Sequence, residues 1–522
     1  MLNLAAALEH SVNEQPDKTA IVFADKRYSY QQINAIANQV ANGLISAGIT
    51  KGDKVALSCL NLPYFPMIYY GILKAGAVVV PINVLLKRNE IGYHLKDSEA
   101  KAYFCFQGTP ELPMAEEGWA GFQQIDTCHH FWLITADPAA ASPIKGTTTF
   151  GQLVEKQPTT FDTVLTNFED TAVILYTSGT TGFPKGAELS HANMTMNAIA
   201  SQNIMHMQSD DVHALVLPLF HSFGQTCQMN AGFSLGNTLV LIPRFTPEAV
   251  LSAIQKEKIT IFIGVPTMYW ALLTYEDKEN QFDFKAIASS LRIGVSGASS
   301  LALEIIKGVE KKYNIPIVEG YGLSETCPVA TFNHVHKKRK PGSVGTPIWG
   351  VEVKIFDKDN QEVEAGEVGE IGIRGHNVMK GYYNKPEATA KTFNNAGWFL
   401  TGDLGRMDEE GYLYIVDRVK DMIIRGGFNV YPREIEEVLM SHPAISMASV
   451  IGVKHDQHGE EIKAFIVLKE GTAATPQEII DWSKDQMAIY KYPRIVEIKE
   501  TLPMTATGKI LKKELKAESA TG

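Results

Sequence analysis

The segment 176–186 reads Tyr-Thr-Ser-Gly-Thr-Thr-Gly-Phe-Pro-Lys-Gly and combines glycines, hydroxyl side chains and one lysine. Gly179 and Gly182 free the backbone, hydroxyl and amide groups can donate hydrogen bonds to phosphate oxygens, and Lys185 supplies a positive charge. The segment is not a Walker A loop, because Pro184 stands where that motif has its second glycine. The composition therefore predicts a phosphate-binding loop of another type.

A second stretch, residues 319–325 with the sequence Glu-Gly-Tyr-Gly-Leu-Ser-Glu, could bind a base and a metal ion. Its glycines permit close approach of the backbone, Tyr321 offers an aromatic face, and Glu325 is a hard oxygen ligand that suits Mg²⁺. A glycine-rich turn that ends in a solvated glutamate is the alternative for this stretch alone. Asp403 and Lys509 have plain alternatives too, since Asp is common in turns and an exposed lysine is usually only solvated.

These stretches and several others occur in an order that resembles the adenylate-forming superfamily. That superfamily contains acyl-CoA synthetases, firefly luciferase and the adenylation domains of peptide synthetases. The other matching segments are Leu-Pro-Leu-Phe-His at 217–221, Ser-Gly-Ala-Ser-Ser at 296–300, Thr-Gly-Asp-Leu at 401–404, Val-Asp-Arg-Val-Lys at 416–420, Gly-Gly at 426–427 and Pro-Met-Thr-Ala-Thr-Gly-Lys at 503–509. They cover nearly the whole chain, and the resemblance is closest to bacterial long-chain fatty acyl-CoA synthetases.

The resemblance implies a site for ATP and Mg²⁺. It implies that Tyr321 stacks on adenine and that Ser324 faces the α-phosphate. Asp403 would accept both ribose hydroxyls, and Mg²⁺ would be held by Thr177 and Glu325. The full set implied for ATP is Thr177, Ser178, Gly179, Thr180, Thr181, Gly182, Lys185, Gly297, Ala298, Ser299, Glu319, Gly320, Tyr321, Gly322, Ser324, Asp403, Arg418 and Lys509.

The resemblance also gives Lys509 a catalytic role, as a cation that bridges the substrate carboxylate and the α-phosphate. Attack of an anionic carboxylate on a polyanionic phosphate meets charge repulsion, which Mg²⁺ and a positioned cation offset in the transition state. No general base is required, because the carboxylate is already ionised at pH 7. The implied catalytic residues are Lys509, Glu325, Lys185 and His221.

A second half-reaction, in which the thiol of CoA displaces AMP to give a thioester, needs a second arrangement of the same site. The resemblance implies that a small C-terminal domain swings about Lys420. Gly426 and Gly427 would line the passage of the pantetheine arm, because glycine has no side chain. Arg425 could meet a CoA phosphate. The basic run 334–340 could also attract CoA phosphates, but a solvated loop is the favoured interpretation of that run.

The expected acid is a medium- to long-chain fatty acid. Amino-acid-activating relatives carry an Asp at the position of His221, which argues against an amino acid. The expected acid pocket consists of His221, Phe220, Phe223, Gly224, Val265, Met268, Gly297 and Gly322. Met229, Phe233 and Tyr269 could extend it as an apolar tunnel, although such residues also pack ordinary cores. A hydroxycinnamate-like aryl acid is the main alternative, and a luciferase-like oxygenase or a non-catalytic adenylate-binding protein is less favoured.

The elements that must position these residues change character along the chain. Apolar β-rich runs such as 172–176 and 259–264 alternate with stretches of helical period, which predicts α/β layers. The later runs 351–356 and 411–416 alternate polar and apolar residues, which predicts antiparallel strands. The predicted fold class is therefore α/β, with a large N-terminal domain of layered α/β subdomains and a β-rich subdomain, followed by a small mobile α+β domain.

The predicted boundaries follow the same changes of pattern. An N-terminal adenylation domain spans 1–417 and includes a β-rich subdomain at about 345–416. A hinge occupies 418–420, and a small C-terminal lid domain spans 421–522. A transmembrane helix at 64–86 is not expected, because charged and proline residues interrupt the apolar run.

Composition limits the partners. The chain has 522 residues and a formal net charge of −10, which argues against nucleic acid because phosphate binding needs a basic face. Five scattered cysteines indicate reduced thiols rather than a metal cluster or a disulfide framework. We expect a cytoplasmic protein with small-molecule partners (ATP, CoA and the acid), at most peripheral membrane contact, and a homodimer as an open option. Its positive charge must then be local, in Lys185, Arg418, Lys509 and bound Mg²⁺.

Overall fold

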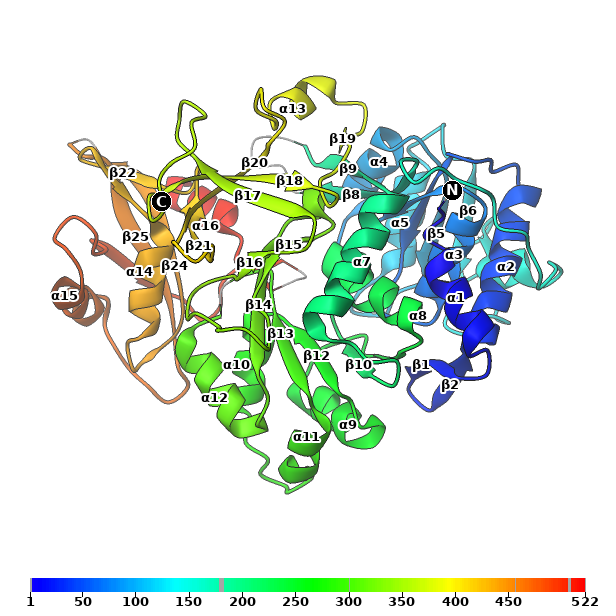
Figure 1. The fold of residues 1–522 in the computed structure, drawn as a ribbon, viewed down its shortest axis with the longest axis horizontal. Coiled ribbons are helices and arrows are strands. Elements are labelled where there is room, and N and C mark those ends of the chain that lie inside the picture. The colour runs from blue at the N-terminus through cyan, green and yellow to red at the C-terminus, as the bar shows by residue number, and fades with distance from the viewer. Residues whose placement is uncertain (1, 178–182, 300, 456, 506–507, 522) are drawn as a thin grey trace.

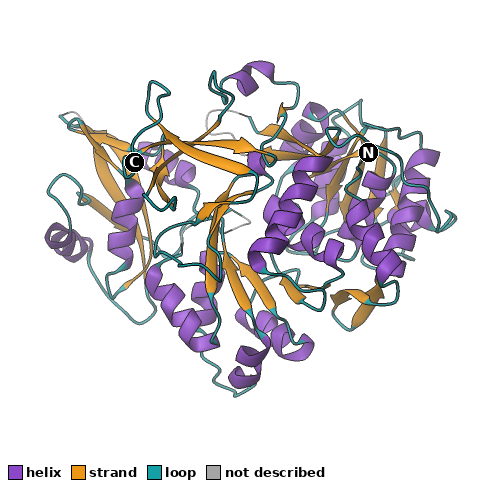
Figure 2. Ribbon diagram, viewed as in Figure 1, coloured by secondary structure: helices purple, strands orange, loops and turns teal. Residues whose placement is uncertain are grey.

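The computed structural model describes residues 2–177, 183–299, 301–455, 457–505 and 508–521. This part of the chain is organised by four sheets. The N-terminal residues, in blue, lie on the right of Figure 1, and the C-terminal residues, in orange and red, lie on the left. Figure 2 shows helices packed along the large sheets.

The first large sheet has eight strands, in the order β19 (Gly381–Tyr382), β9 (Lys185–Ser190), β8 (Thr171–Thr177), β4 (Val78–Pro81), β3 (Lys54–Ser58), β5 (Ala100–Phe106), β6 (His130–Ile134) and β7 (Thr148–Thr149). Its helices are α2 (Tyr30–Ser46), α3 (Tyr64–Lys74), α4 (Arg88–Asp97), α5 (Met114–Phe122), α6 (Phe150–Val154) and α7 (His191–Met205). The strands from β8 to β7 run parallel, whereas β8 and β9 form an antiparallel pair. The residues of the predicted phosphate loop connect that pair.

The second large sheet has nine strands, in the order β16 (Thr346–Pro347), β15 (Val329–Phe332), β14 (Ile317–Gly322), β13 (Ile293–Ser296), β12 (Ile261–Gly264), β10 (Val212–Leu215), β11 (Thr238–Leu241), β1 (Thr19–Phe23) and β2 (Lys26–Ser29). Its helical elements are α1 (Ala6–Glu14), the π-helix η1 (Phe223–Asn230), α8 (Ala231–Leu235), α9 (Pro247–Glu257), α10 (Pro266–Thr274), α11 (Phe284–Ser290), α12 (Leu303–Tyr313) and the 3₁₀-helix η2 (Ser324–Thr326). Strands β10, β12, β13 and β14 pair in parallel, so their carboxyl ends meet at one edge.

The β-rich segment forms a four-stranded antiparallel sheet, as its alternating sequence predicts. Its strands are β17 (Val351–Phe356), β18 (Gly369–Gly375), β20 (Phe399–Met407) and β21 (Leu413–Arg418), and the short helix α13 (Pro386–Ala390) lies between β19 and β20 in the chain. Within this sheet Asp403 lies directly opposite Arg418. Two residues that the motifs link to the nucleotide are therefore cross-strand neighbours.

The C-terminal residues form a sheet and cores of their own. The strands are β22 (Ile423–Arg425), β23 (Phe428–Val430), β24 (Ile445–His455), β25 (Gly459–Leu468) and β26 (Ile495–Ile498), and the helices are α14 (Pro432–Met440), α15 (Pro476–Gln486) and α16 (Lys512–Thr521). Helix α14 buries Ile435 and Leu439 in a cluster that is separate from the main core. The fold class predicted from the sequence, with a large α/β part and a small α+β part, is confirmed.

The apolar run at 64–86 is interior structure. Helix α3 buries every residue from Phe65 to Lys74, and β4 is buried throughout. The Lys74 ammonium group donates to Glu9 and, at 3.4 Å, to Thr163 Oγ1. Of the helices in the described ranges, none has the length and apolar character needed to cross a membrane. All five cysteines are buried free thiols.

Candidate active site

Most of the residues singled out in the sequence lie at or just beyond the carboxyl ends of β10, β12, β13 and β14. His221 follows β10, Val265 follows β12, Gly297 follows β13, and Tyr321 lies near the end of β14. Parallel strands bring such residues to one edge of the sheet, where open α/β sheets bind their ligands. Residues 178–182, which contain the predicted Ser178, Gly179, Thr180, Thr181 and Gly182, lie outside the described residues.

Asp403, Tyr321 and Arg418 form a connected polar group. The Tyr321 hydroxyl donates to Asp403 Oδ2 at 2.7 Å, and Arg418 Nε lies 3.2 Å from Asp403 Oδ1. The Asp403 amide donates to Thr401 Oγ1 at 3.1 Å. Burial, reinforced by the Asp403 charge, raises the pKa of Tyr321 well above its usual value, so the phenol stays protonated. This buried carboxylate, with a cation beside it, suits recognition of hydroxyl groups.

Lys509 comes from the C-terminal part of the chain, and its charge interacts with those of Arg418 and Asp403. Burial, assisted by the positive charge of Arg418, lowers the pKa of Lys509 to about 8, while Asp403 acts in the opposite direction. Burial and the charge of Lys509 lower the pKa of His221 to about 4. Lys509 and His221 are therefore close, although they are far apart in the sequence.

The segment that carries Lys509, called the lysine segment below, contacts the start of helix α10 through Gly508. Gly508 has a φ of +74°, and a Cβ there would lie 2.9 Å from Thr267 Oγ1 and 3.4 Å from Val265 Cγ2. The Lys509 amide donates to Thr505 Oγ1 at 3.1 Å, which closes a turn before α16. The missing side chain of Gly508 thus permits close docking.

Glu325 and Lys185 both contact Tyr382, a residue that the sequence analysis missed. Glu325 is buried, and its Oε1 accepts a hydrogen bond from the Tyr382 hydroxyl at 2.9 Å. The Nζ atom of Lys185 lies 4.3 Å from the centre of the Tyr382 ring. In the sequence, segment 377–383 resembles the corresponding segment of fatty acyl-CoA synthetases, but that resemblance suggested no role for Tyr382.

The donor set of Glu325 and Thr177 fits Mg²⁺. Glu325 offers a carboxylate, and Thr177, which pairs across the ladder with Lys185, offers a hydroxyl. Among the residues that the structure describes, no group of three or more His, Cys, Asp or Glu side chains could hold a metal ion. Mg²⁺ characteristically binds through one or two protein oxygens together with phosphates and water, and a carboxylate and a hydroxyl are oxygen ligands of that kind.

Both stems of the predicted phosphate loop are held by helix α4. Tyr93 donates from its hydroxyl to the Pro184 carbonyl at 2.7 Å and stacks on Phe183 with ring centres 5.1 Å apart. One turn later, Asp97 Oδ2 accepts from the Tyr176 hydroxyl at 3.0 Å. The loop therefore starts and ends at fixed points.

Several glycines of the motifs have a packing reason. A Cβ on Gly320 would lie 2.2 Å from the Phe332 ring, and a Cβ on Gly322 would lie 1.7 Å from the Pro328 carbonyl oxygen. A Cβ on Gly297 would lie 2.8 Å from the Phe223 ring. Close packing between neighbouring segments thus accounts for these three residues, whether or not a ligand approaches them.

The remaining nucleotide candidates surround these glycines. Ala298 has a φ of +69°, Ser299 is exposed, and Ser324 begins η2. Glu319 is buried and accepts from the Leu301 amide at 2.9 Å. Burial raises the pKa of Glu319 to about 7.

The expected acid pocket is brought together in part. Phe223 and Gly224 begin η1, Phe223 packs against Gly297, and Val265 lies next to Gly508. Met268 is buried on α10 and Phe220 is half-buried beside His221. The Phe223 amide donates to His221 Nδ1 at 3.3 Å.

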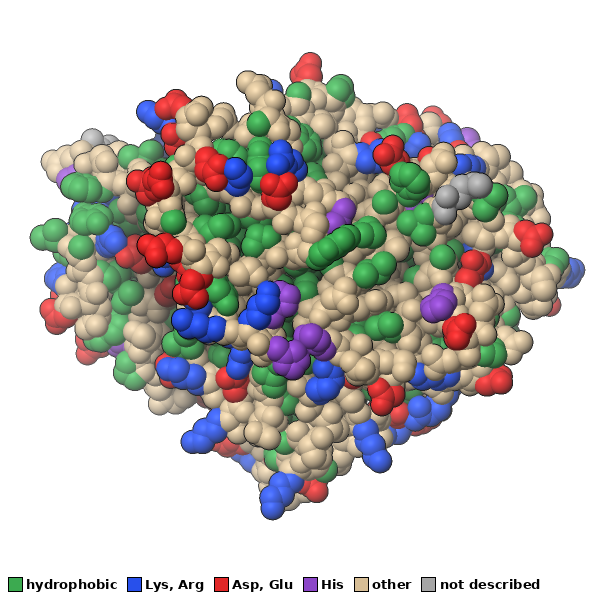
Figure 3. All heavy atoms as spheres, in the orientation of Figure 1, with side chains coloured by type: hydrophobic (Ala, Val, Ile, Leu, Met, Phe, Trp, Pro, Cys, Tyr) green, Lys and Arg blue, Asp and Glu red, His purple; other side chains and the backbone are tan. Residues whose placement is uncertain are grey.

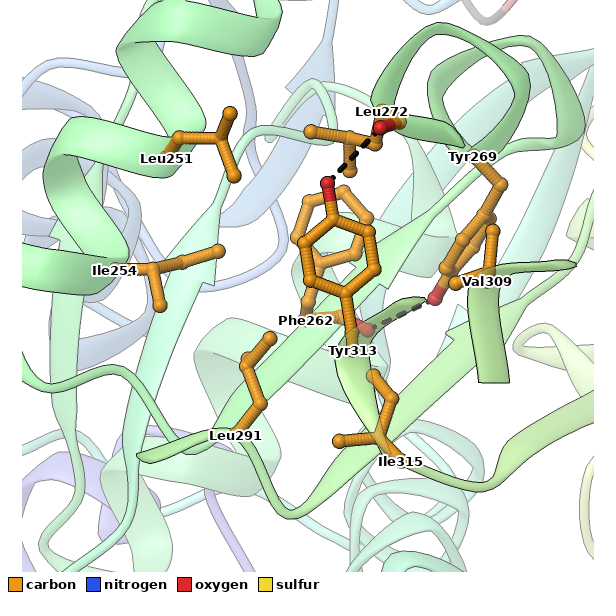
Figure 4. Close-up of a pocket in the computed structure, with 9 residues that line it drawn as sticks. All are labelled: Leu251, Ile254, Phe262, Tyr269, Leu272, Leu291, Val309, Tyr313 and Ile315. Carbon is orange, nitrogen blue, oxygen red and sulfur yellow. Dashed lines mark hydrogen bonds between the residues drawn. The ribbon is translucent and has the colours of Figure 1, made fainter. Parts of the chain in front are cut away.

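The three residues considered for a longer tunnel belong to the hydrophobic core, in the same cluster as Phe223, Val265 and Met268. Met229 is fully buried. Phe233 packs against Tyr30 and Tyr70, with ring centres 5.6 and 5.7 Å away. Tyr269 borders the small apolar pocket in Figure 4, and its hydroxyl donates to the carbonyls of Phe262 and Val295 at 3.1 and 2.9 Å.

The residues assigned to CoA and to the hinge lie at the start of the C-terminal part. Gly426 and Gly427 form the tip of the β22–β23 hairpin with φ values of +56° and +84°, which a two-residue hairpin turn of this kind requires. Arg425 forms a double hydrogen bond with Glu461 at 2.5 and 2.9 Å. Lys420 is exposed and follows β21.

A further residue at this junction was missed. Asp417 is buried, and its two oxygens accept from the Arg418 and Arg433 amides at 2.7 and 2.9 Å. It therefore joins the end of β21 to the first turn of α14. The charged run at 417–421 was the signal.

The basic run is largely neutralised by nearby carboxylates. Lys340 pairs with Asp408 at 2.5 Å and with Glu410 at 2.7 Å, and Arg339 pairs with Glu310. On the face drawn in Figure 3, blue and red side chains are interspersed. These ion pairs support the structural interpretation of the run.

Comparison with known proteins places these features in context. The family model described as AMP-binding enzyme matches residues 8–383, and the one described as AMP-binding enzyme C-terminal domain matches residues 434–509. The long-chain-fatty-acid–CoA ligase of Bacillus subtilis (strain 168) is 36% identical, over 99% of this chain and 94% of that protein. The feruloyl-CoA synthase of an Amycolatopsis species is 34% identical, over 96% of each. The crystal structure of ATP-bound MatB from Rhodopseudomonas palustris has 30% identity and a TM-score of 0.89, over 99% of each chain.

Proposed function

The chain belongs to the AMP-binding enzyme family, and from that premise we propose that it is an ATP- and Mg²⁺-dependent acid–CoA ligase. It converts a carboxylic acid and ATP to an acyl-adenylate and pyrophosphate, and then uses the thiol of CoA to release AMP and form acyl-CoA. The observation that carries this proposal is the position of Lys509. The charge of Lys509, from the C-terminal part, interacts with those of Asp403, Arg418 and His221, and the adjacent Gly508 lies against Thr267 and Val265, which supports a role for this cation where a nucleotide and an acid would meet.

Lys509 serves the first half-reaction by charge. The acid and the α-phosphate are both anionic, so a cation between them lowers the repulsion that the transition state must overcome. Mg²⁺, when held by Glu325 and Thr177, supplies further positive charge toward the phosphates. The Asp403–Arg418 pair orients the ribose, which keeps the α-phosphate within reach of Lys509.

His221 contributes as a neutral group. Its pKa of about 4 leaves the imidazole uncharged at pH 7. Because Nδ1 accepts from the Phe223 amide, Nε2 carries the proton and can donate to an acid oxygen. A neutral donor orients the carboxylate without quenching its nucleophilicity as a full positive charge would.

We propose a medium- to long-chain fatty acid as the substrate. The buried apolar side chains of Phe223, Val265 and Met268 support this choice, as does the named activity of the B. subtilis relative. A hydroxycinnamate-like acid is the second candidate, because the feruloyl-CoA synthase is nearly as similar. A non-catalytic adenylate-binding protein has less support, since Lys185, Glu325, Asp403, Arg418 and Lys509 are all present. These residues do not distinguish a luciferase-like oxygenase, which shares the adenylation step, and light output with a luciferin is its test.

We also propose that the protein adopts two arrangements, one for each half-reaction. A unit of residues 421–522 turns about Lys420 relative to residues 1–417 and exchanges Lys509 for the hairpin that carries Gly426 and Gly427. The separate core of the C-terminal part supports independent movement. The turn geometry explains both glycines without CoA, so their contact with the pantetheine arm needs its own test.

The experiment is release of pyrophosphate by purified protein with MgATP, CoA and a panel of acids from acetate to palmitate and coumarate. We expect acid-dependent release that is greatest for a medium- or long-chain acid, together with formation of the acyl-CoA. Release greatest with coumarate would favour the aryl-acid alternative. The absence of acid-dependent pyrophosphate with every acid would overturn the proposed function.

A further inference from the structure

The side chain of Tyr382 contacts two groups of opposite charge, the Glu325 carboxylate and the Lys185 ammonium group. Its exposed fraction is 8%. Its hydroxyl donates to Glu325 at 2.9 Å, while Lys185 Nζ lies over its ring face at 4.3 Å from the centre. A tyrosine edge binds an anion through its hydroxyl, and its π face attracts a cation, so one ring satisfies both groups.

Contacts of the Tyr382 backbone fix the position of the Tyr382 ring. Strand β19 pairs with β9, and Tyr382 lies opposite Ala187, two residues beyond Lys185. The Tyr382 amide donates to Thr389 Oγ1 at 2.9 Å.

The neighbouring residue repeats the arrangement at the surface. The Tyr383 hydroxyl donates to Glu99 at 2.5 Å, and Lys54 Nζ lies 4.7 Å from the centre of the Tyr383 ring. There the lysine and the glutamate also approach each other, at 3.9 Å. Between Lys185 and Glu325, by contrast, the described part of the chain contains no such ion pair.

We propose that Tyr382 is a positioning residue that separates Lys185 from Glu325, so that each charge stays available for the ligand. Without the ring, the ammonium and carboxylate groups would pair in a partly buried site, where such attraction is strong. A paired Lys185 binds phosphate less well, and a paired Glu325 is a poorer metal ligand. The inference rests on the proposed function, because it takes Lys185 and Glu325 to be the groups that meet MgATP.

The first test measures binding of ATP alone, in EDTA, by equilibrium dialysis with no turnover. We expect Tyr382→Leu to weaken binding about fivefold, since it removes the ring, whereas Tyr382→Phe stays within about twofold because the ring remains. Tyr383→Leu is the matched control and leaves binding unchanged. Equal binding by Tyr382→Leu and Tyr383→Leu would overturn the proposal.

The second test asks whether the loss arises from the carboxylate. Adding Glu325→Gln to Tyr382→Leu frees Lys185, so ATP affinity should recover toward that of the unsubstituted protein. Glu325→Gln alone also raises ATP affinity, because it removes a charge that repels ATP. The factor by which Glu325→Gln raises ATP affinity in Tyr382→Leu must therefore be at least about threefold larger than the factor in the unsubstituted protein. Equal gains in the two backgrounds would contradict the proposal, because a merely structural defect is not rescued by removing a charge.

The two levels of inference fail separately. If the unsubstituted protein releases no acid-dependent pyrophosphate, the proposed function fails, whatever the binding results. If it does release pyrophosphate but Tyr382→Leu binds ATP as Tyr383→Leu does, only the role of Tyr382 fails. Circular dichroism and the thermal midpoint of each variant establish that it is folded.

Discussion

Lys509 is a charged side chain in a place that disfavours its charge. Burial, assisted by the positive charges of Arg418 and Lys420, lowers its pKa to about 8, and the negative charges of Asp403 and Asp421 oppose this only in part. The two anions of the proposed reaction, a phosphate and a carboxylate, would stabilise the ammonium form. The bound reactants, rather than the unliganded protein, therefore stabilise the charged form of Lys509.

Replacing Lys509 should separate the two half-reactions. Lys509→Ala removes the cation between the two anions, so we expect adenylation to slow by about two orders of magnitude or more, the size typical for loss of one transition-state contact. Thioester formation from supplied acyl-AMP should be spared. Acid-dependent pyrophosphate release and acyl-CoA formation are the two measurements, and equal loss of both would contradict the split roles.

The pH dependence of adenylation should show an alkaline limb. Because the pKa of Lys509 is about 8 in the unliganded protein, its charge is lost as the pH rises through that value. The profile of kcat/KM for ATP, which reports the free enzyme, should therefore fall above about pH 8. In Lys509→Arg, the guanidinium keeps its charge, so the residual activity should lack this limb. A limb that is unchanged in that variant would assign the titration to another group.

At the scale of elements, glycines in similar sequence contexts are required for different structural reasons. Gly322 ends β14, and a Cβ there would meet the Pro328 carbonyl oxygen of the neighbouring segment. Gly427 ends a hairpin turn with a φ of +84°, and a Cβ there would meet nothing within 4 Å. Packing fixes the first glycine, and backbone conformation fixes the second.

Alanine substitutions should rank accordingly. Gly322→Ala forces strand β15 to shift, so we expect a loss of about 3 kcal/mol in the free energy of unfolding. Gly427→Ala pays only for an unfavourable backbone conformation, about 1 kcal/mol. Urea unfolding of the two variants measures the difference. A cost for Gly427→Ala that equals or exceeds the cost for Gly322→Ala would mean that the hairpin tip is packed against something.

At the scale of the whole molecule, the site depends on contact between the two parts of the chain. Gly508 lies against Thr267 and Val265 of the large part, and Asp417 ties β21 to α14. A side chain at Gly508 would crowd Thr267, so small changes there should alter how Lys509 enters the site.

Gly508→Ala should therefore affect adenylation selectively. The new Cβ would come within 2.9 Å of Thr267 Oγ1, so either the Thr267 side chain or the segment that carries Lys509 must shift. We expect adenylation to slow about tenfold, equivalent to about 1.4 kcal/mol, with thioester formation from acyl-AMP almost unchanged.

Gly471→Ala is the matched control for this prediction. Gly471 has a φ of +75°, but a Cβ there would meet nothing within 4 Å. It carries the same backbone strain without the contact, and its adenylation rate should stay near that of the unsubstituted protein. If the two variants slow adenylation equally, strain rather than docking explains the effect.

The sequence by itself determined the family, the α/β class and the antiparallel segment after residue 345, because residue type and spacing encode local conformation and local chemistry. Strand β17, for example, follows directly from the alternation at 351–356. The tertiary structure alone decided that Lys509 lies near His221, that Tyr382 stands between Lys185 and Glu325, and that Met229, Phe233 and Tyr269 pack the core. Those facts depend on which distant segments pack together. That choice is made by burial and close packing of the whole chain, which no local pattern contains.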